Sequence, residues 1–318
     1  MNSISAMEKE IGYQIDYLHK LDLPAQVDMN DCLFIGAGDS YAAALVAHYA
    51  SNYKAVCSDP VEIAYNHEII SKNRLRRVYI ISVSGNTQSN ILAAKVLRKN
   101  DVPTTAITAK SDSELARNCD VVIPLNYEST GISTSGTISF MCSMLCCLSL
   151  ARKIEAINQM ARIYRQSSKE VRNLIHKYQR KVSSYIFLAD GILFPIALYG
   201  TLKVNEVFGL RSFAYTTEQF YHSPLFSLKE SDMIMILANK KYNLRRSEEL
   251  NIRLTKLGLP SACIIYFDGV SITELLLKSM LLTQLFIVKK AQEKGMVDCF
   301  FLRDRGLLKL SSDFIYHR

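Results

Sequence analysis

The chain has 318 residues, of which 49% are hydrophobic and 21% are charged. This length suits two domains of about 150 residues each, and the composition is that of a folded chain rather than a disordered or collagen-like one. The formal net charge of +8 favours anionic partners such as phosphorylated metabolites or nucleic acid. Because no run of four or more Lys or Arg residues occurs, we expect no nucleic-acid binding.

The cysteines and the apolar segments restrict further which class of protein this can be. The 8 cysteines form no Cys-x-x-Cys pair, and the 6 histidines do not pair with them at zinc-ligand spacing, so we expect no metal and a reduced, cytoplasmic protein. The segment 1–20 is charged and amphipathic, unlike a signal peptide. Residues 129–151 are uncharged over the length of a membrane span, but only 138–150 is strongly apolar. We expect a buried core helix there and no membrane segment.

Strands and helices alternate along the first half of the chain. The apolar run 32–38 predicts a strand that ends in a glycine turn, and a helical stretch follows at 40–53. The strand of 76–87 ends in a loop rich in Ser and Gly. The pattern then predicts a helix at 88–100, strands at 104–110 and 121–125, and a helix at 138–153. This alternation predicts a parallel sheet with helices on both faces.

The second half repeats this pattern. The run YIFLADG (185–191) aligns with CLFIGAG (32–38), DMIMILANKK (232–241) with RRVYIISVSG (76–85), and ACIIYF (262–267) with TTAITAK (104–110). We infer a tandem duplication. The expected division is an N-terminal helix with a first domain over 1–155, a linker helix over 156–182 and a second domain over 183–318. The loop 82–87 has no counterpart rich in hydroxyls in the second copy, so we expect a ligand loop in the first domain only.

The loop 82–87, Ser-Val-Ser-Gly-Asn-Thr, follows an apolar strand and precedes a helix. Ligands of open α/β folds bind at this edge of the sheet, and hydroxyls, backbone N–H groups and a helix N-terminus suit a phosphate. The candidate phosphate-binding residues are Ser82, Ser84, Gly85 and Thr87. The spacing matches neither GxGxxG nor GxxxxGK[ST], so no nucleotide cofactor is indicated. Ser84 or Thr87 can also cap the helix, which is compatible with binding.

Two other helix starts add candidates. In the turn Gly36-Ala37-Gly38-Asp39-Ser40, Gly38 and Ser40 are expected to face the same crevice as the loop 82–87. Ser133, Thr134 and Ser135 precede the apolar helix and either add hydroxyls to the phosphate site or form a simple N-cap cluster.

The order of these motifs resembles the sugar isomerase (SIS) domain, and the whole chain resembles the double-SIS arrangement. That arrangement forms the isomerase half of glucosamine-6-phosphate synthase and its stand-alone relatives, which include phosphosugar isomerases and amino-sugar phosphate deaminases. The resemblance implies an α/β fold of two tandem SIS domains, each a parallel β-sheet flanked by helices in a flavodoxin-like αβα sandwich. It also implies a sugar-phosphate substrate, no cofactor, and a homodimer whose sites are completed across the interface.

The resemblance extends to the catalytic residues. The segment 197–206 resembles the family's helix with the catalytic glutamate, which falls on Glu206, and Lys203 is expected in the substrate site. The segment 218–225 resembles the motif with the ring-opening histidine, which falls on His222. In the tail, Lys309 matches the lysine that contacts the open-chain sugar and can form a Schiff base with a ketose. From the residues alone, Glu206 beside Lys203 is typical of a surface ion pair.

Several departures from the family pattern bear on the substrate more than on the fold. Tyr199 replaces a family glutamate, Gln219 replaces the glutamate before the histidine, and Gly136 replaces a lysine. Asn2 stands at the position where the synthase has its nucleophilic cysteine, so we expect no glutamine-dependent amide transfer. Three functions follow as expectations: a phosphosugar aldose–ketose isomerase, an amino-sugar phosphate deaminase that uses the same site, and a non-catalytic phosphosugar-binding protein.

Overall fold

The computed structural model describes residues 1–66, 75–155, 157–178, 181–241, 243–259, 262–267 and 270–316. The chain divides into two compact units. The amino-terminal unit consists of Asp16–Thr130, Gly136–Ile154 and Asp304–Arg318. The carboxy-terminal unit consists of Glu155–Arg303 together with Met1–Ile15 and Gly131–Ser135. Three segments differ from the division expected above. The N-terminal helix and Gly131–Ser135 belong to the carboxy-terminal unit, and the C-terminal tail belongs to the amino-terminal unit.

The amino-terminal unit contains a sheet of 5 parallel strands in the order β2-β1-β3-β4-β5. Its strands are β1 (Cys32–Ile35), β2 (Val56–Ser58), β3 (Arg77–Ile81), β4 (Thr104–Thr108) and β5 (Val121–Pro124). This is the strand order of flavodoxin-like folds, whose ligands bind between β1 and β3 at the carboxyl ends of the strands. The order therefore brings the turns after β1 and β3 to neighbouring positions.

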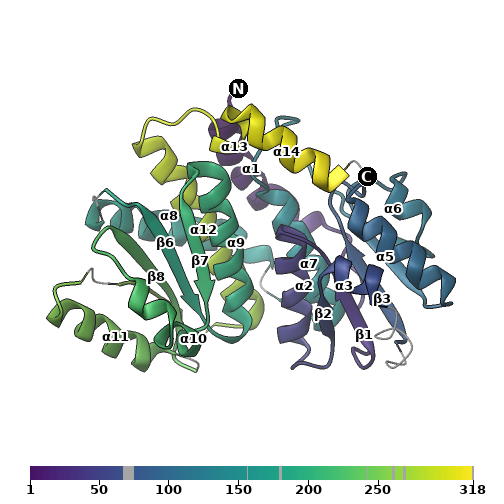
Figure 1. Ribbon diagram of the computed structural model, residues 1–318, viewed down its shortest axis with the longest axis horizontal. Coiled ribbons are helices and arrows are strands. Elements are labelled where there is room, and N and C mark those ends of the chain that lie inside the picture. Colours follow the sequence, from purple (N-terminus) through teal and green to yellow (C-terminus); the bar gives the residue numbers. More distant parts are fainter. Residues whose placement is uncertain are drawn as a thin grey trace. The chain divides into compact units, whose positions relative to one another are not determined.

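Helices cover both faces of this sheet (Figure 1). On one face α2 (Asp39–Ala50) packs against α7 (Ile138–Ala151), and on the other α3 (Pro60–Tyr65) packs against α5 (Gln88–Lys99). The unit also contains η1 (Leu18–Lys20), α6 (Glu114–Arg117) and α14 (Arg305–Tyr316). Helix α7 is buried along nearly its whole length, as expected for 138–150. Among the described residues, no helix combines the length and the apolar character that crossing a bilayer requires.

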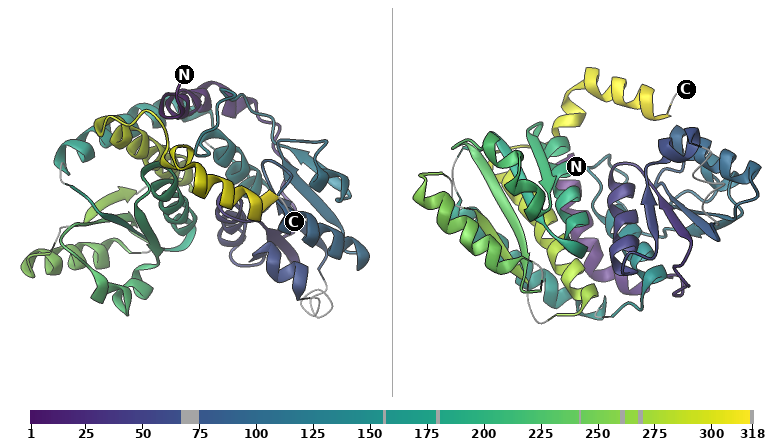
Figure 2. Two further views of the ribbon diagram at one scale, coloured as in Figure 1. Left: turned by 45° about the horizontal axis from the view of Figure 1, so that its top comes forward. Right: turned by 60° about the horizontal axis from the view of Figure 1, so that its bottom comes forward.

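The carboxy-terminal unit contains a second parallel sheet, of 4 strands, in the order β7-β6-β8-β9. Its strands are β6 (Ser184–Ala189), β7 (Arg211–Tyr215), β8 (Asp232–Asn239) and β9 (Cys263–Phe267). This is the order of β2-β1-β3-β4 in the other unit, which is the relationship that a duplication predicts. Both sheets and their helices are seen from two further sides in Figure 2.

Long helices line one face of the second sheet. Tyr185 of β6 lies against Phe208 of α9 (Phe194–Phe208) and Phe286 of α12 (Ile272–Glu293). Helix α8 (Met160–Lys177) packs on α12, and α1 (Ser3–Tyr17) joins α12 through a hydrogen bond of 2.7 Å from Gln14 to Gln284. The opposite face is covered by α10 (Thr217–Tyr221) and α11 (Leu244–Lys256). The shorter elements are η2 (Ile157–Gln159), η3 (Gly191–Leu193), η4 (Pro224–Ser227) and α13 (Phe300–Arg303).

The expected linker helix of 156–182 corresponds to η2 and α8, although residues 156, 179 and 180 lie outside the described residues. Helix α8 packs along α12 within the carboxy-terminal unit. Its apolar side chains Met160, Ile163 and Val171 are buried there.

Candidate active site

The loop between β3 and α5 is organised around the Ser82 hydroxyl. Ser82 is 3% exposed, and its Oγ accepts a hydrogen bond of 3.1 Å from the Gly85 backbone N–H and lies 3.2 Å from Thr87 Oγ1. The Asn86 N–H donates to Ser84 Oγ at 3.3 Å. Thr87 is the N-cap residue of α5, but its side chain makes no capping hydrogen bond. The loop therefore presents hydroxyls and an N-terminal helix turn in the arrangement that binds anions.

Gly85 is required by this loop for two reasons. Its φ of +64° lies in the left-handed region, which side chains with a Cβ rarely adopt. A Cβ at this position would also lie 2.0 Å from Ser113 Oγ. The Gly85 carbonyl accepts the N–H of Leu115 at 2.9 Å, which ties the loop to α6.

An open pocket of about 530 Å³ lies beside this loop. It is lined by Ser84, Asn86, Gln88, Glu114 and Tyr316. The Glu114 carboxylate is paired with Lys95 at 2.9 Å. Sequence reasoning did not find Glu114 or Tyr316, because they belong to α6 and to the tail helix, far from the loop in the chain.

The turn after β1 adds a second hydroxyl at the same edge of this sheet. Gly38 has a φ of +57° and is the N-cap residue of α2. Ser40 lies in the first turn of that helix and is 9% exposed. Because β1 and β3 are neighbours, both predicted phosphate-binding turns lie at the carboxyl ends of adjacent strands.

Glu206 of α9 lies in a polar cluster within the carboxy-terminal unit. Its Oε2 accepts a hydrogen bond of 2.7 Å from Lys203 Nζ and a short one from the Ser135 hydroxyl. The Lys203 side chain is 1% exposed, whereas that of Glu206 is 40% exposed. A buried ammonium is costly without a partner, so the Glu206 carboxylate stabilises Lys203 at the base of the cluster. The carboxylate itself stays open to a ligand.

The segment of Ser133, Thr134 and Ser135 contacts this same unit. Thr134 donates to Glu10 of α1 at 3.1 Å, and Ser135 donates to Glu206. Ser133 is exposed and makes no hydrogen bond to any described residue. Neither Thr134 nor Ser135 acts as the N-cap residue of α7, which is Thr137. Sequence reasoning missed both carboxylate partners because they are far away in the chain.

Cys299 lies next to the Glu206 cluster and is fully buried. Its N–H donates to Ser3 Oγ at 2.8 Å, and its Sγ lies 3.6 Å from Met7 Sδ. Burial raises the pKa of the Cys299 thiol. Cys299 therefore lies beside the Glu206 cluster as a buried, neutral thiol.

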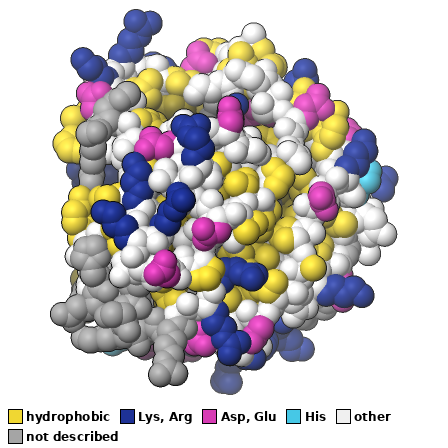
Figure 3. Space-filling model, turned by 90° about the vertical axis from the view of Figure 1, so that its right-hand side faces the viewer, with side chains coloured by type: hydrophobic (Ala, Val, Ile, Leu, Met, Phe, Trp, Pro, Cys, Tyr) yellow, Lys and Arg dark blue, Asp and Glu magenta, His cyan; other side chains and the backbone are white. Residues whose placement is uncertain are grey.

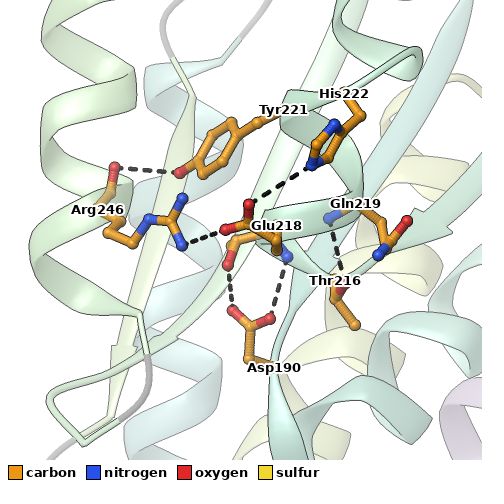
Figure 4. Close-up of polar contacts among 8 residues, drawn as sticks. Asp190, Thr216, Glu218, Gln219, Tyr221, His222 and Arg246 are labelled. Carbon is orange, nitrogen blue, oxygen red and sulfur yellow. Dashed lines mark hydrogen bonds and ion pairs between the residues drawn. The ribbon is translucent and has the colours of Figure 1, made fainter.

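His222 follows α10 and is exposed to solvent. Its side chain is 69% exposed, and Nε2 lies 3.6 Å from Glu218 Oε1. Glu218 also accepts a hydrogen bond of 2.5 Å from Arg246, which lowers the pKa of that carboxyl (Figure 4). Within the described residues, the His222 imidazole makes no hydrogen bond to Glu206. The two predicted catalytic groups thus belong to separate polar clusters.

The segment that carries His222 is anchored from two sides. Asp190, at the carboxyl end of β6, accepts hydrogen bonds from the backbone and the hydroxyl of Thr217. On the other side, the Arg246 guanidinium lies 4.7 Å from the centre of the Tyr221 ring. These contacts hold α10 at the sheet, and the imidazole of His222 is turned toward Glu218 (Figure 4).

The remaining predictions concern Lys309, metals and nucleic acid. Lys309 is exposed on α14, in the amino-terminal unit. Among the described residues, no group of three or more His, Cys, Asp or Glu side chains could hold a metal ion. On the described part of the face in Figure 3, basic side chains are interspersed with acidic and apolar ones rather than gathered in one extended patch.

Residues 28–152 match the model of the SIS domain family. The stretch that holds the loop 82–87 therefore matches the SIS domain family, and the resemblance predicted from the sequence motifs is confirmed for these residues.

Individual relatives extend the likeness beyond this stretch. A glutamine–fructose-6-phosphate aminotransferase of Legionella pneumophila (strain Lens) is 26% identical over 254 residues, which make up 74% of this chain. The match covers 40% of that relative's length. The structure of a glucosamine-6-phosphate deaminase from Thermotoga maritima has a TM-score of 0.74, with 21% identity over 92% of this chain and 96% of its own.

Tagatose-6-phosphate ketose/aldose isomerase from Escherichia coli has a TM-score of 0.65, with 14% identity over 92% of this chain and 89% of its own. At these identities the structures show the fold. The predicted α/β class, with two tandem parallel sheets flanked by helices, is confirmed.

Proposed function

We propose that this chain is a phosphosugar isomerase that interconverts the aldose and ketose forms of a hexose or amino-hexose 6-phosphate. The observation that carries the proposal is the Glu206 cluster. A carboxylate that is 40% exposed is fixed by a buried ammonium and a hydroxyl, both on one of its oxygens. That arrangement leaves the other oxygen, Oε1, available to a substrate. It suits a group that must take a proton from carbon and return it to a neighbouring carbon.

The proposed chemistry uses Glu206 as both base and acid. The carboxylate takes the proton from C2 of the open-chain aldose, and the electron pair moves into a C1–C2 double bond as the carbonyl oxygen gains a proton. The resulting enediol loses the proton of its C2 hydroxyl, and Glu206 returns the first proton to C1, which gives the ketose. Acid–base catalysis of this kind contributes about 10²–10⁴-fold, and positioning of the substrate adds to it.

We assign the phosphate of the substrate to the hydroxyls and backbone N–H groups of the amino-terminal unit. The residues are Ser40, Ser82, Ser84 and Thr87, with Gly38 and Gly85 shaping the two turns. The uncapped first turn of α5 supports this assignment, because helix N-termini bind anions. A phosphate bound by these groups would anchor the substrate and lower the entropic cost of the reaction.

His222 is assigned to ring opening, as a relay of a proton between the ring oxygen and O1. Its exposure and its separation from the Glu206 cluster within the chain favour a homodimer in which a second copy supplies this histidine. The anchored α10 supports such a role, since a residue donated to another subunit must be held rigidly on its own.

A second candidate function is the deamination of an amino-sugar 6-phosphate. The observation that favours it is the fold shared with the Thermotoga maritima glucosamine-6-phosphate deaminase, at a TM-score of 0.74. In this reaction the same proton transfer from C2 to C1 would give an imine at C2, and hydrolysis of that imine by water would release ammonia and leave the ketose. Lys309 is assigned to the open-chain sugar in either reaction.

One experiment separates these functions. The purified chain is incubated with glucose, mannose and glucosamine 6-phosphates, and ketose formation and ammonia release are measured in parallel. Ketose formation without ammonia supports the isomerase, and ammonia release from the amino sugar supports the deaminase. If calorimetry detects binding but neither product forms, the chain is a non-catalytic phosphosugar-binding protein. The variant Glu206→Gln is expected to lose turnover in either assay, and full activity in that variant would show that Glu206 is not the base.

A further inference from the structure

One face of α9 carries Tyr199, Lys203 and Glu206 in sequence. The Lys203 Nζ lies 5.2 Å from the centre of the Tyr199 ring and 2.7 Å from Glu206 Oε2. Tyr199 is fully buried, and Lys203 is 1% exposed. The ammonium is thus in contact with an aromatic face as well as with the carboxylate.

Tyr199 is buried on a helix that packs closely on the sheet. Gly200 lies so close to β6 that a Cβ there would be 2.8 Å from the Phe187 ring. A helix that approaches the sheet this closely leaves its buried side chains little room to change rotamer. The ring therefore offers Lys203 a rigid surface.

A lysine side chain is a flexible chain of four carbons with several rotatable bonds. An ion pair alone therefore restrains the position of its ammonium weakly. An aromatic face attracts the ammonium through its quadrupole without adding a charge, and the attraction is stronger when both groups are desolvated. In the family that the motifs indicate, a glutamate occupies the position of Tyr199. A carboxylate there would compete with Glu206 for the same ammonium, whereas the ring does not.

We propose that Tyr199 is a positioning residue, whose ring holds the Lys203 ammonium against Glu206 Oε2 and thereby orients the carboxylate. This inference rests on the proposed function, because it assigns Tyr199 a role in proton transfer by Glu206. The ring acts only through Lys203 and does not contact the substrate.

The test is a series of substitutions that changes the electron density of the ring at constant shape. Tyr199→Phe keeps the ring, and fluorinated phenylalanines at position 199 weaken its attraction for a cation in steps. We expect kcat close to the wild-type value in Tyr199→Phe and a graded fall of about 2- to 30-fold across the fluorinated series, with KM changing less than twofold. Tyr199→Leu should lie at the low end of the series.

The matched control is the same series at Tyr185, another fully buried tyrosine of the unit, whose ring packs near Phe187, Phe208 and Phe286. Its fluorination should leave kcat unchanged. If kcat at position 199 does not depend on fluorination, or if the Leu variant is as active as the Phe variant, the proposal is overturned.

A second measurement does not depend on turnover. In protein with ¹³C-labelled lysine, the ε-CH₂ resonance of Lys203, assigned by its loss in Lys203→Arg, should be shifted upfield by the ring and should return toward the ordinary position in Tyr199→Leu. An unshifted resonance in the wild-type protein would overturn the proposal. If no sugar phosphate is turned over, the proposed function fails on its own, and this resonance still decides whether the ring holds the ammonium.

Discussion

The Ser135 hydroxyl donates a hydrogen bond to Glu206 Oε2, the same oxygen that accepts one from Lys203. Two donors on one oxygen leave Oε1 of this carboxylate as the atom available to a substrate. This hydrogen bond joins the segment of small polar residues before α7 to the last turn of α9, and both belong to one compact unit.

Ser135→Ala removes one of these two donors. A hydrogen bond to a charged group contributes about 1.5–3 kcal/mol when buried, and the 40% exposure of Glu206 reduces this to about 1 kcal/mol. We therefore expect kcat to fall about fivefold in the sugar-phosphate assay, with the melting temperature nearly unchanged. Ser133→Ala, at an exposed neighbour, is the control and should retain wild-type kcat. Equal activity of the two variants would show that Ser135 does not orient the carboxylate.

Gly85→Ala tests the loop between β3 and α5. The substitution meets a left-handed φ of +64° and a contact of 2.0 Å with Ser113, so we expect a loss of stability of about 2 kcal/mol or more, and a large rise in KM for the sugar phosphate. Gly131→Ala is the matched control, because its φ is +72° with nothing within 4 Å of the added Cβ. It should lose only about 1 kcal/mol. Thermal unfolding of both variants measures the difference, and equal losses would contradict the steric argument.

Much of the fold could be predicted because the central strands are apolar runs that end in glycine or serine turns. Strands β1, β3 and β6 have this pattern, whereas β8 is an apolar run that ends at Asn239, and all four lie within a few residues of their expected bounds. The edge strands β2 and β7 were missed, since each is short and partly exposed and carries no continuous apolar run. Helix α12 was also missed, because a segment buried on nearly all sides shows little helical periodicity.

The candidate site was predictable only in part. The residues of the loop 82–87 are adjacent in the chain, so their grouping needed no tertiary information. The contacts of Ser135 with Glu206 and of Thr134 with Glu10 join residues that are 71 and 124 positions apart, and no local pattern marks such pairs. His222 and Glu206 belong to separate clusters within the chain, and the proposed dimer assigns the histidine to a second copy.

The buried thiols provide a test of the two cores. Burial raises the pKa of Cys146 in α7 and of Cys263 in β9 to about 12, from an ordinary value of 9.0. At pH 8 they should react with iodoacetamide only after unfolding, since the thiolate is the reactive form.

The same shifts make stability fall at alkaline pH. Above pH 9 these thiols ionise in the unfolded chain but not in the folded one, so the unfolded state binds fewer protons and the melting temperature should drop as the pH rises from 9 toward 11. The double variant Cys146→Ala, Cys263→Ala should show a smaller drop. Rapid labelling of the native protein at pH 8 would contradict the burial of these groups.

Arg246→Gln tests the cluster that holds His222. The hydrogen bond from Arg246 lowers the pKa of the Glu218 carboxyl below its ordinary value of 4.5. The ion pair of Glu218 with Arg246 therefore contributes its full stabilisation above pH 4.5, and this stabilisation is lost as the pH falls through the lowered pKa of Glu218. An NMR titration of Glu218 should show its pKa rising toward 4.5 in Arg246→Gln. Arg253→Gln, which removes the partner of Glu249, is the control and should leave the titration of Glu218 unchanged. A Glu218 pKa that is the same with and without Arg246 would contradict this ion pair.

Transfer of a proton by Glu206 between neighbouring sugar carbons is tested most directly by isomerisation in deuterated water. The sugar-phosphate product is followed by NMR at C1 and C2. The wild-type protein should place deuterium at the carbon that receives the proton, because a carboxylate exposed to solvent exchanges its proton before returning it, and Glu206→Gln should abolish both turnover and labelling. Turnover without any deuterium at C1 or C2, or labelling that persists in Glu206→Gln, would contradict the assignment of Glu206 as the proton-transfer group.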